Sequence, residues 1–194
     1  MKLILSSCDF RNEHSAKCIY DNLGVAVKDC KVLYFPNEKS TEELIYSGMY
    51  EARLNEFGFK AENVHVFNYW NPNKFFNLDI DAIYISGGNT FGTMKRIREA
   101  KADSAIIEYV KNGAVYIGGS AGAHIATPDI THVQKYDTNT FGLCDFSSLG
   151  LCNRILICHY NDDRENDYIE LRRSSKYEVA TLTNDEFLVI SSQL

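Results

Sequence analysis

The chain has 194 residues, of which 26 are acidic and 20 basic, giving a net charge of −6. Its hydrophobic share of 45% and charged share of 24% are ordinary globular values and exclude a disordered chain. The length is that of one domain, so we expect a single domain over residues 1–194. A net negative chain without a basic run disfavours nucleic acid and anionic membranes as partners, and no apolar stretch approaches the ~20 residues that a bilayer span needs.

The N-terminus contains Leu5-Ser6-Ser7-Cys8, which superficially looks like a lipoprotein cleavage site. Only Met1–Ile4 precedes it, whereas a signal peptide needs an apolar core of about 7–15 residues. We therefore interpret residues 2–6 as a first strand. The cysteines form no Cys-x-x-Cys pair, and several lie in apolar runs such as residues 154–158, which is typical of free buried thiols. We therefore expect a cytoplasmic protein, with a disulfide framework as the alternative.

Strand and helix signals alternate over the first 127 residues. Short apolar runs predict strands at 2–6, 31–35, 64–67, 81–85 and 114–117. Helical periodicity predicts helices near 16–23, over 40–58 and over 90–111, the last with a break near Asp103. Five strands separated by helices predict an α/β fold with a doubly wound, mostly parallel sheet. The default strand order is then flavodoxin-like.

The helix expected over 40–58 has clear boundary signals. Ser40 and Glu43 form a capping box at its start, and Gly58 is well placed to end it. Ile45, Met49 and Ala52 would face the core.

The chain changes character after Thr127. Residues 128–153 are irregular and rich in turn formers. Beyond them we expect a strand at 154–158, a polar helix at 164–173, and two short strands at 179–182 and 187–190.

A glycine-rich turn after the strand at 114–117 carries the strongest chemical signal. Gly118-Gly119-Ser120-Ala121-Gly122 fits Gly-x-Ser-x-Gly, the nucleophile elbow, in which a serine sits on a sharp strand-to-helix turn with small neighbours. The hydroxyl then projects over a helix N-terminus, where free N–H groups favour negative charge. The pattern predicts Ser120 as a nucleophile, against the alternative of a turn needed only for packing.

A serine hydroxyl needs a base to take its proton. His159 ends the apolar run at 155–158, so it lies at a strand end like Ser120. His124 is one helical turn beyond Ser120 and should point away, and His132 lies in the irregular segment. We predict His159 as the base.

The third member should be an acid that orients the imidazole. Asp137 is our prediction, and Asp129, Asp162 and Asp163 remain alternatives.

The turn after the strand at 81–85 offers a second set of backbone donors. Gly88, together with Ala121 after the nucleophile, would form a two-donor oxyanion hole. Neither a dinucleotide fingerprint nor a P-loop nor His-Glu-x-x-His occurs, so we expect no cofactor and no metal.

These motifs together resemble the peptidase E family of serine peptidases, which includes aspartyl dipeptidase and, more distantly, cyanophycinase. The residues that carry the resemblance are Gly87-Gly88-Asn89-Thr90-Phe91, then Gly118-Gly-Ser-Ala-Gly-Ala123, then His159-Tyr160. The resemblance implies a fold related to class I glutamine amidotransferases. It also implies the same roles for Ser120, His159, Gly88 and Ala121.

The chain departs from the family pattern at several points. Ser86 stands where the family often has a glycine, and Cys158 stands where a proline usually precedes the histidine. The family's aspartate aligns nearer Lys135 than Asp137. Arg164 matches an arginine implicated in holding the acidic side chain of the substrate, and with Asn89 it is our prediction for substrate binding.

The sequence thus predicts a serine peptidase that hydrolyses short peptides, with dipeptides carrying an N-terminal Asp as a narrower expectation. An esterase of the α/β-hydrolase type shares Gly-x-Ser-x-Gly. The lack of a His-Gly-Gly motif and the strands after His159 weigh against it. A non-catalytic ligand-binding protein on the same scaffold is the third alternative.

Overall fold

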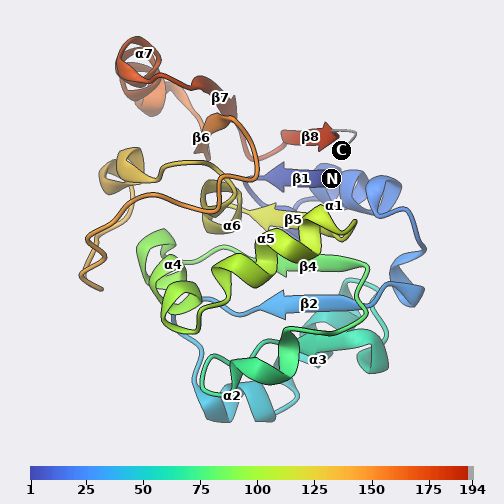
Figure 1. The fold of residues 1–194 in the computed structure, drawn as a ribbon. Helices are drawn as coiled ribbons and strands as arrows, with labels where there is room; N and C mark the ends of the chain where they lie inside the picture. The colour runs from blue at the N-terminus through green and yellow to red at the C-terminus, as the bar shows by residue number, and fades with distance from the viewer. Residues whose placement is uncertain (192–194) are drawn as a thin grey trace.

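Six strands form the central sheet in the computed structural model, which describes residues 1–191 (Figure 1). The strands are β1 Lys2–Ser6, β2 Val32–Phe35, β3 Val64–Val66, β4 Ala82–Ile85, β5 Val115–Gly119 and β8 Phe187–Ser191. The last three residues of the predicted domain, 1–194, lie outside the described residues. The single domain therefore stays a prediction.

The sheet order is β3-β2-β4-β5-β1-β8, with β8 antiparallel to β1 and the other pairs parallel. The predicted doubly wound, mostly parallel α/β fold is confirmed. The order differs from the flavodoxin type because β1 lies beyond β5 instead of beside β2. The four residues of β2 and of β4 are all buried, so strand composition alone does not define neighbours.

The chain reverses its direction of winding between β2 and β4. It leaves β2 for β3 on one side and leaves β4 for β5 on the other. In open α/β sheets, ligands bind in the crevice at the carboxyl ends of the strands at such a reversal. The loops that follow β2, β4 and β5 therefore share the edge of the sheet where a site is expected.

Helices cover both faces of the sheet. They are α1 Glu13–Asn22, α2 Glu42–Tyr46 and α3 Met49–Glu56 on one face, and α4 Thr90–Glu99, α5 Asp103–Lys111 and α6 Ala121–Ile125 on the other. The strands alternate between these faces, as the period of two requires. Leu3 and Leu5 pack in the cluster that includes Met94 of α4, whereas Ile4 packs in the cluster that includes Ile19 of α1.

The helix predicted over 40–58 is two helices, α2 and α3. Gly48 separates them with a φ of 77°, a left-handed conformation that glycine adopts at no steric cost. The N-cap is Thr41, whose hydroxyl accepts a hydrogen bond from Leu44 N at 3.2 Å, and not Ser40.

This break changes which side chains face the core. Ile45 is buried as predicted, but Met49 and Ala52 are exposed. Tyr50 and Leu54 take the inward positions of α3 instead. Because the chain turns at Gly48, α3 does not continue the rotation of α2. A helical periodicity that is counted through Gly48 therefore assigns the wrong residues of α3 to the core.

A smaller unit stands beside the central sheet, above it in Figure 1. It consists of a parallel pair, β6 Arg154–Cys158 and β7 Glu178–Leu182, joined by α7 Glu165–Ser174, and we call it the β6–β7 unit. No residue of α7 is buried. After β7 the chain returns to the central sheet as β8, so the unit is tied to the core at both ends.

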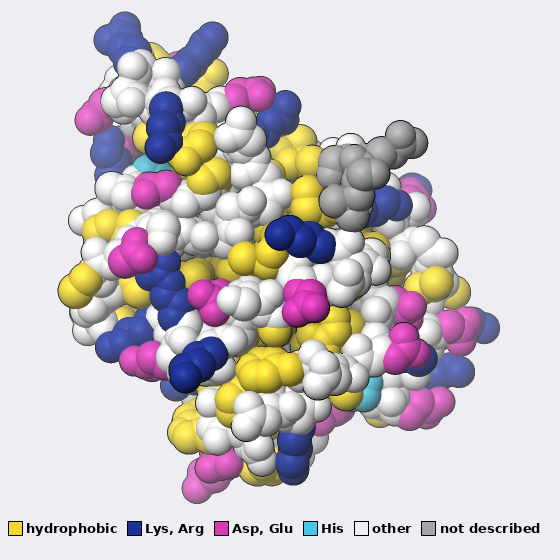
Figure 2. All heavy atoms as spheres, viewed as in Figure 1, with side chains coloured by type: hydrophobic (Ala, Val, Ile, Leu, Met, Phe, Trp, Pro, Cys, Tyr) yellow, Lys and Arg dark blue, Asp and Glu magenta, His cyan; other side chains and the backbone are white. Residues whose placement is uncertain are grey.

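On the surface, basic and acidic side chains are interspersed over the face that Figure 2 shows. Among residues 1–191, no helix has the length and apolar character needed to cross a membrane.

Candidate active site

Ser120 lies on the sharp turn between β5 and α6. Its backbone has φ 49° and ψ −105°, a conformation that residues with a Cβ rarely adopt. Its amide donates to Ser6 O at 2.8 Å, which ties the turn to β1. The chain thus holds the hydroxyl at the carboxyl edge of the sheet.

Small residues around Ser120 are a steric requirement. A Cβ on Gly122 would lie 2.0 Å from Ile85 O, and a Cβ on Gly119 would lie 2.3 Å from the Asp9 carboxylate. Both distances are far below van der Waals contact. Gly122 of the Gly-x-Ser-x-Gly pattern therefore lets α6 approach β4 closely, and Gly119, at the first x position, lets the Asp9 side chain approach β5.

His159 follows the last residue of β6 and faces Ser120. Its Nε2 lies 2.8 Å from Ser120 Oγ, and its φ of 53° turns the chain sharply after the strand. Its amide donates to Ser7 Oγ at 2.9 Å, and that hydroxyl in turn donates to Leu182 O at 2.9 Å. The predicted serine and histidine are thus brought together by two different sheets.

The other nitrogen of the imidazole contacts an amide. His159 Nδ1 lies 2.7 Å from Oδ1 of Asn184, in the loop between β7 and β8. Because an amide oxygen only accepts, Nδ1 carries the proton and Nε2 is left to accept from the serine hydroxyl. The hydrogen bonds of the side chains therefore select the tautomer that a general base needs.

Asp137, predicted as the acid of the triad, makes a different contact. Its Oδ2 accepts from Thr90 N at 2.8 Å, at the start of α4. The Thr90 hydroxyl lies 3.5 Å from His124 Nδ1. Asp137 thus satisfies a free amide of α4, and Asn184 occupies the position beside the imidazole.

A search for an acid could not have found Asn184, because its side chain is neutral. The sequence offered a signal in its position, since Asn184 follows the strand expected at 179–182 as His159 follows the strand expected at 154–158. The structure pairs these strands in parallel, with Cys158 opposite Leu182. Residues that follow these two strands must meet at the same edge, which places Asn184 beside His159.

The predicted oxyanion donors lie in the two turns that follow β4 and β5. Gly88 is exposed and has a φ of 157°, and Ala121 is the first residue of α6. Among residues 1–191, no acceptor within the protein takes a hydrogen bond from Gly88 N or Ala121 N. Both donors are therefore free for a substrate.

The two residues predicted to bind substrate are engaged with the protein. Asn89 caps α4, since its Oδ1 accepts from Gly92 N at 3.0 Å and its Nδ2 donates to Thr138 O at 3.0 Å. Arg164 donates through Nη1 to Cys158 O, and its guanidinium carbon lies 4.0 Å from the centre of the Tyr136 ring.

A cationic group that the sequence argument missed lies close to Ser120. A Cβ built on Gly87 would lie 3.0 Å from Arg11 Nη2 and 3.4 Å from Ser120 Cβ. Arg11 also forms an ion pair with the fully buried Asp9, with Nε 3.0 Å from Oδ1. Its signal in the sequence was weak, because it lies in a short loop after β1.

Two buried histidines lie behind the site. Burial lowers the pKa of both His124 and His132, so both are neutral near pH 7. His124 Nε2 accepts from Cys158 N at 3.4 Å, and His132 Nε2 donates to Leu156 O at 2.8 Å. Both side chains therefore support β6, the strand that carries His159.

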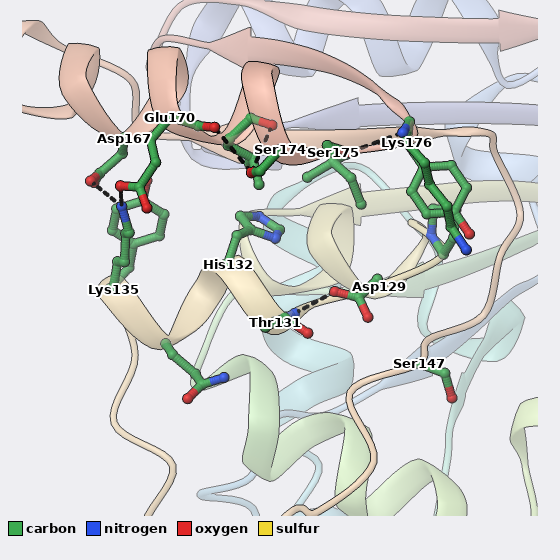
Figure 3. A pocket seen from close by; sticks show the side chains of 16 residues that line it. Asp129, Thr131, His132, Lys135, Ser147, Asp167, Glu170, Ser174, Ser175 and Lys176 are labelled. Atoms are coloured by element: carbon green, nitrogen blue, oxygen red, sulfur yellow. Dashed lines mark hydrogen bonds and ion pairs between the residues drawn. The ribbon is translucent and has the colours of Figure 1, made fainter.

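A groove of about 660 Å³ runs between α7 and the 3-10 helix Thr131–Lys135 (Figure 3). Lys135, at the end of this 3-10 helix, crosses the groove to α7, where it forms ion pairs with Asp167 at 2.8 Å and Glu170 at 2.7 Å. Neither Ser120 nor His159 lines this groove. Within the described part of the chain, no three His, Cys, Asp or Glu side chains are grouped so that they could hold a metal ion.

The sheet, the strained serine turn and the serine–histidine contact are together the arrangement of a serine hydrolase. Comparison with known proteins specifies the family. The chain matches the model of peptidase family S51 over residues 3–193, and it belongs to that family.

Two curated relatives and two solved structures show the range of similarity. The uncharacterized peptidase Lmo0363 of Listeria monocytogenes is 31% identical over 115 residues, which cover 57% of this chain and 56% of that protein. Peptidase E of Citrobacter koseri is 41% identical over 76 residues, which cover 38% of this chain and 31% of that protein. The matches thus span about half or less of these relatives.

The solved structures resemble the chain over nearly its whole length. A Listeria monocytogenes protein described as a candidate peptidase E superposes with a TM-score of 0.73 at 22% identity, covering 100% of this chain and 98% of its own. A peptidase from an acI-B1 actinobacterium superposes with a TM-score of 0.68 at 15% identity, covering 97% and 82%. At these identities the likeness shows the fold.

Proposed function

We propose that this protein is a cytoplasmic serine peptidase that hydrolyses short peptides through an acyl-enzyme, with Ser120 on a nucleophile elbow. The observation that carries the proposal is the 2.8 Å contact between Ser120 Oγ and His159 Nε2, with Nδ1 occupied by Asn184. Membership of peptidase family S51 supports a peptide as the substrate.

In this mechanism, Ser120 Oγ attacks the scissile carbonyl while His159 Nε2 takes its proton. The N–H groups of Gly88 and Ala121 hold the oxyanion of the tetrahedral intermediate. His159 then returns the proton to the departing amine. In deacylation, water attacks the acyl carbon while His159 Nε2 takes its proton, and that proton passes to Ser120 Oγ as the bond between Oγ and the acyl carbon breaks.

Asn184 takes the orienting role that the sequence argument assigned to Asp137. Its carbonyl oxygen fixes the productive tautomer of His159, as a carboxylate would. A neutral amide gives less electrostatic stabilisation to the imidazolium that forms during the reaction than a carboxylate gives. We therefore propose a Ser120–His159–Asn184 site in which Asp137 stabilises α4.

Selection of an N-terminal Asp is a narrower proposal. It requires Arg164 to leave the Tyr136 ring and the Cys158 carbonyl and to turn toward the cleft. A guanidinium can then hold a carboxylate through two parallel hydrogen bonds.

The test is Ser120→Ala, measured with a set of dipeptides and with a fluorophosphonate probe. Loss of the nucleophile should lower kcat on the order of 10⁴–10⁶-fold and abolish labelling. Ser174→Ala, which changes an exposed serine of α7, is the matched control and should leave both unchanged. Wild-type turnover in folded Ser120→Ala would overturn the proposal.

The alternatives give different results in the same experiment. An esterase would be labelled and would hydrolyse a p-nitrophenyl ester, but it would cleave none of the dipeptides. A ligand-binding protein would be neither labelled nor active.

A further inference from the structure

The loop after β4 is bonded to β2 and to the turn that follows β2 through side chains that include Tyr34, Asn37 and Glu38. Asn37 follows β2, and its Nδ2 donates to Gly87 O at 3.1 Å. The sheet order places β2 on one side of β4 and β5, with Ser120 at its end, on the other. The Gly87 carbonyl therefore points away from the nucleophile.

Because the peptide bond between Gly87 and Gly88 is planar, this contact also determines the direction of the Gly88 N–H. The described chain contains no cis peptide bond, and in a trans peptide the C=O and the following N–H point in opposite directions. With Gly87 O directed to β2, Gly88 N–H is directed toward β5. A Cβ on Gly87 would lie 3.4 Å from Ser120 Cβ, so this peptide is adjacent to the nucleophile.

A second residue holds the other end of the loop. Glu38 is 7% exposed, and its Oε2 accepts from Asn89 N at 2.9 Å. A Cβ on Gly88 would lie 2.6 Å from Glu38 Oε2 and 2.7 Å from Asn37 Cβ. The loop is therefore packed directly on these two side chains.

The amide of Asn37 is itself fixed. Its Oδ1 accepts from Lys39 N at 3.1 Å, an Asx turn that leaves only the NH₂ group to face the loop. Because both ends of the amide are in use, Gly87 O meets a donor whose direction is set by the turn.

We propose that Asn37 is a positioning residue for the oxyanion hole: by holding Gly87 O, it aims Gly88 N–H at the substrate's oxyanion. The inference rests on the proposed function, since it requires hydrolysis by Ser120. No other group of the protein competes for Gly88 N–H among residues 1–191, as an oxyanion donor requires.

The test is Asn37→Ser. A serine hydroxyl can still accept from Lys39 N, and it is neutral, but it is too short to reach Gly87 O. Loss of one oxyanion donor costs about 10²–10³ in kcat, and a misdirected donor should cost about tenfold to 10²-fold. KM should change by less than about threefold, because the hole acts on the transition state.

The affinity for a peptide aldehyde is a second measurement, and it would not change if Asn37 had a purely structural role. Its adduct with Ser120 places an oxyanion in the hole, so its affinity should fall by the same factor as kcat. Asn63→Ser is the matched control, because Asn63 Nδ2 also donates to a backbone carbonyl, Lys28 O, at 3.1 Å, but before β3 at the opposite end of the sheet. It should leave kcat and aldehyde affinity within about twofold.

Asn37→Asp provides a second variant. It keeps the acceptor for Lys39 N but directs an oxygen at Gly87 O, and its kcat should be at least as low as that of Asn37→Ser.

Three results would overturn the inference while the proposed function stands: wild-type kcat in both Asn37 variants, an equal fall in Asn63→Ser, or a rise in KM with kcat and aldehyde affinity unchanged. Absence of Ser120-dependent hydrolysis in the wild type would instead overturn the proposed function, and the inference with it.

Discussion

Ser120 and His159 are held in place by different kinds of interaction. Around Ser120 the constraint is steric, because Gly119 and Gly122 leave no space for a single added carbon. Around His159 it is polar, because its amide is bound by Ser7 and its ring by Asn184. Close packing in the central sheet thus fixes the nucleophile, whereas a few hydrogen bonds from the loops after β1 and β7 fix the base.

This difference predicts where the site tolerates change. Truncating a residue that bonds to His159 removes only a hydrogen bond. A side chain added at Gly122 must displace the backbone of Ile85, and one added at Gly119 must displace the buried side chain of Asp9. Substitutions of His159, Asn184 and Arg164 test the polar contacts of the site, and we expect each variant to keep the fold.

The largest effect is expected for His159→Ala. Because serine and base act as a unit, kcat should fall on the order of 10⁴–10⁶-fold, and the double variant with Ser120→Ala should be little worse. His65→Ala, a change in β3 at the far edge of the sheet, is the control and should leave kcat unchanged. Mild loss in His159→Ala beside severe loss in His124→Ala or His132→Ala would assign the base elsewhere.

A smaller effect is expected for Asn184→Ala. The ring of His159 keeps its bond to Ser120 but loses the group that selects its tautomer, so kcat should fall by about 10–100-fold. Asp185→Asn is the control and should leave kcat unchanged. Asp185 lies in the same loop as Asn184, but its carboxylate accepts a hydrogen bond from Asn12 Nδ2 at 2.7 Å.

Asn184→Asp tests how a charge at position 184 changes the protonation of His159. A carboxylate beside the imidazole favours its charged form, so activity should be lost at a higher pH on acidification than in the wild type. If Asn184→Ala keeps full activity while Asp137→Asn loses about 10²-fold, Asp137 acts on the base and the proposed role of Asn184 is wrong.

The smallest effect is expected for Arg164→Ala. Arg164 contacts Cys158 O and the Tyr136 ring, so its loss should lower kcat/KM for Asn-Leu and Ala-Leu by about two- to fivefold. If Arg164 also holds the substrate's N-terminal Asp, kcat/KM for Asp-Leu should fall by about a further tenfold, which corresponds to 1.4 kcal/mol. Arg172→Ala, which removes an exposed arginine of α7, is the control. An equal loss with all three dipeptides would contradict the selection of an N-terminal Asp and would leave Arg164 as a support for the loop that carries His159.

The sequence predicted the strands and the fold class well because five short apolar runs alternate with helical periodicity. It did not predict the position of β1, since buried strands of similar composition have no pattern that specifies neighbours. It also did not predict the break at Gly48, because an isolated glycine in a periodic segment does not by itself mark a turn.

For the candidate site, the sequence predicted that Ser120 and His159 both follow apolar strands, and the structure places those strands in two different sheets. The partner of the imidazole was not predicted, because a serine triad usually places an acid there and the side chain of Asn184 is neutral. Asn37 was missed for another reason. Its role depends on which strand lies beside β4, and only the three-dimensional order of the sheet supplies that.

The hydroxyl of Ser7 has a consequence for local unfolding. It accepts from His159 N and donates to Leu182 O, so one atom of the β1 loop joins both strands of the β6–β7 unit to the core. The helix α7 buries no residue and can fray at small cost, since segments with few buried contacts open independently. Amide hydrogens of α7 should therefore exchange with solvent far faster than that of His159, and the serine–histidine pair should persist while the helix beside it opens and closes.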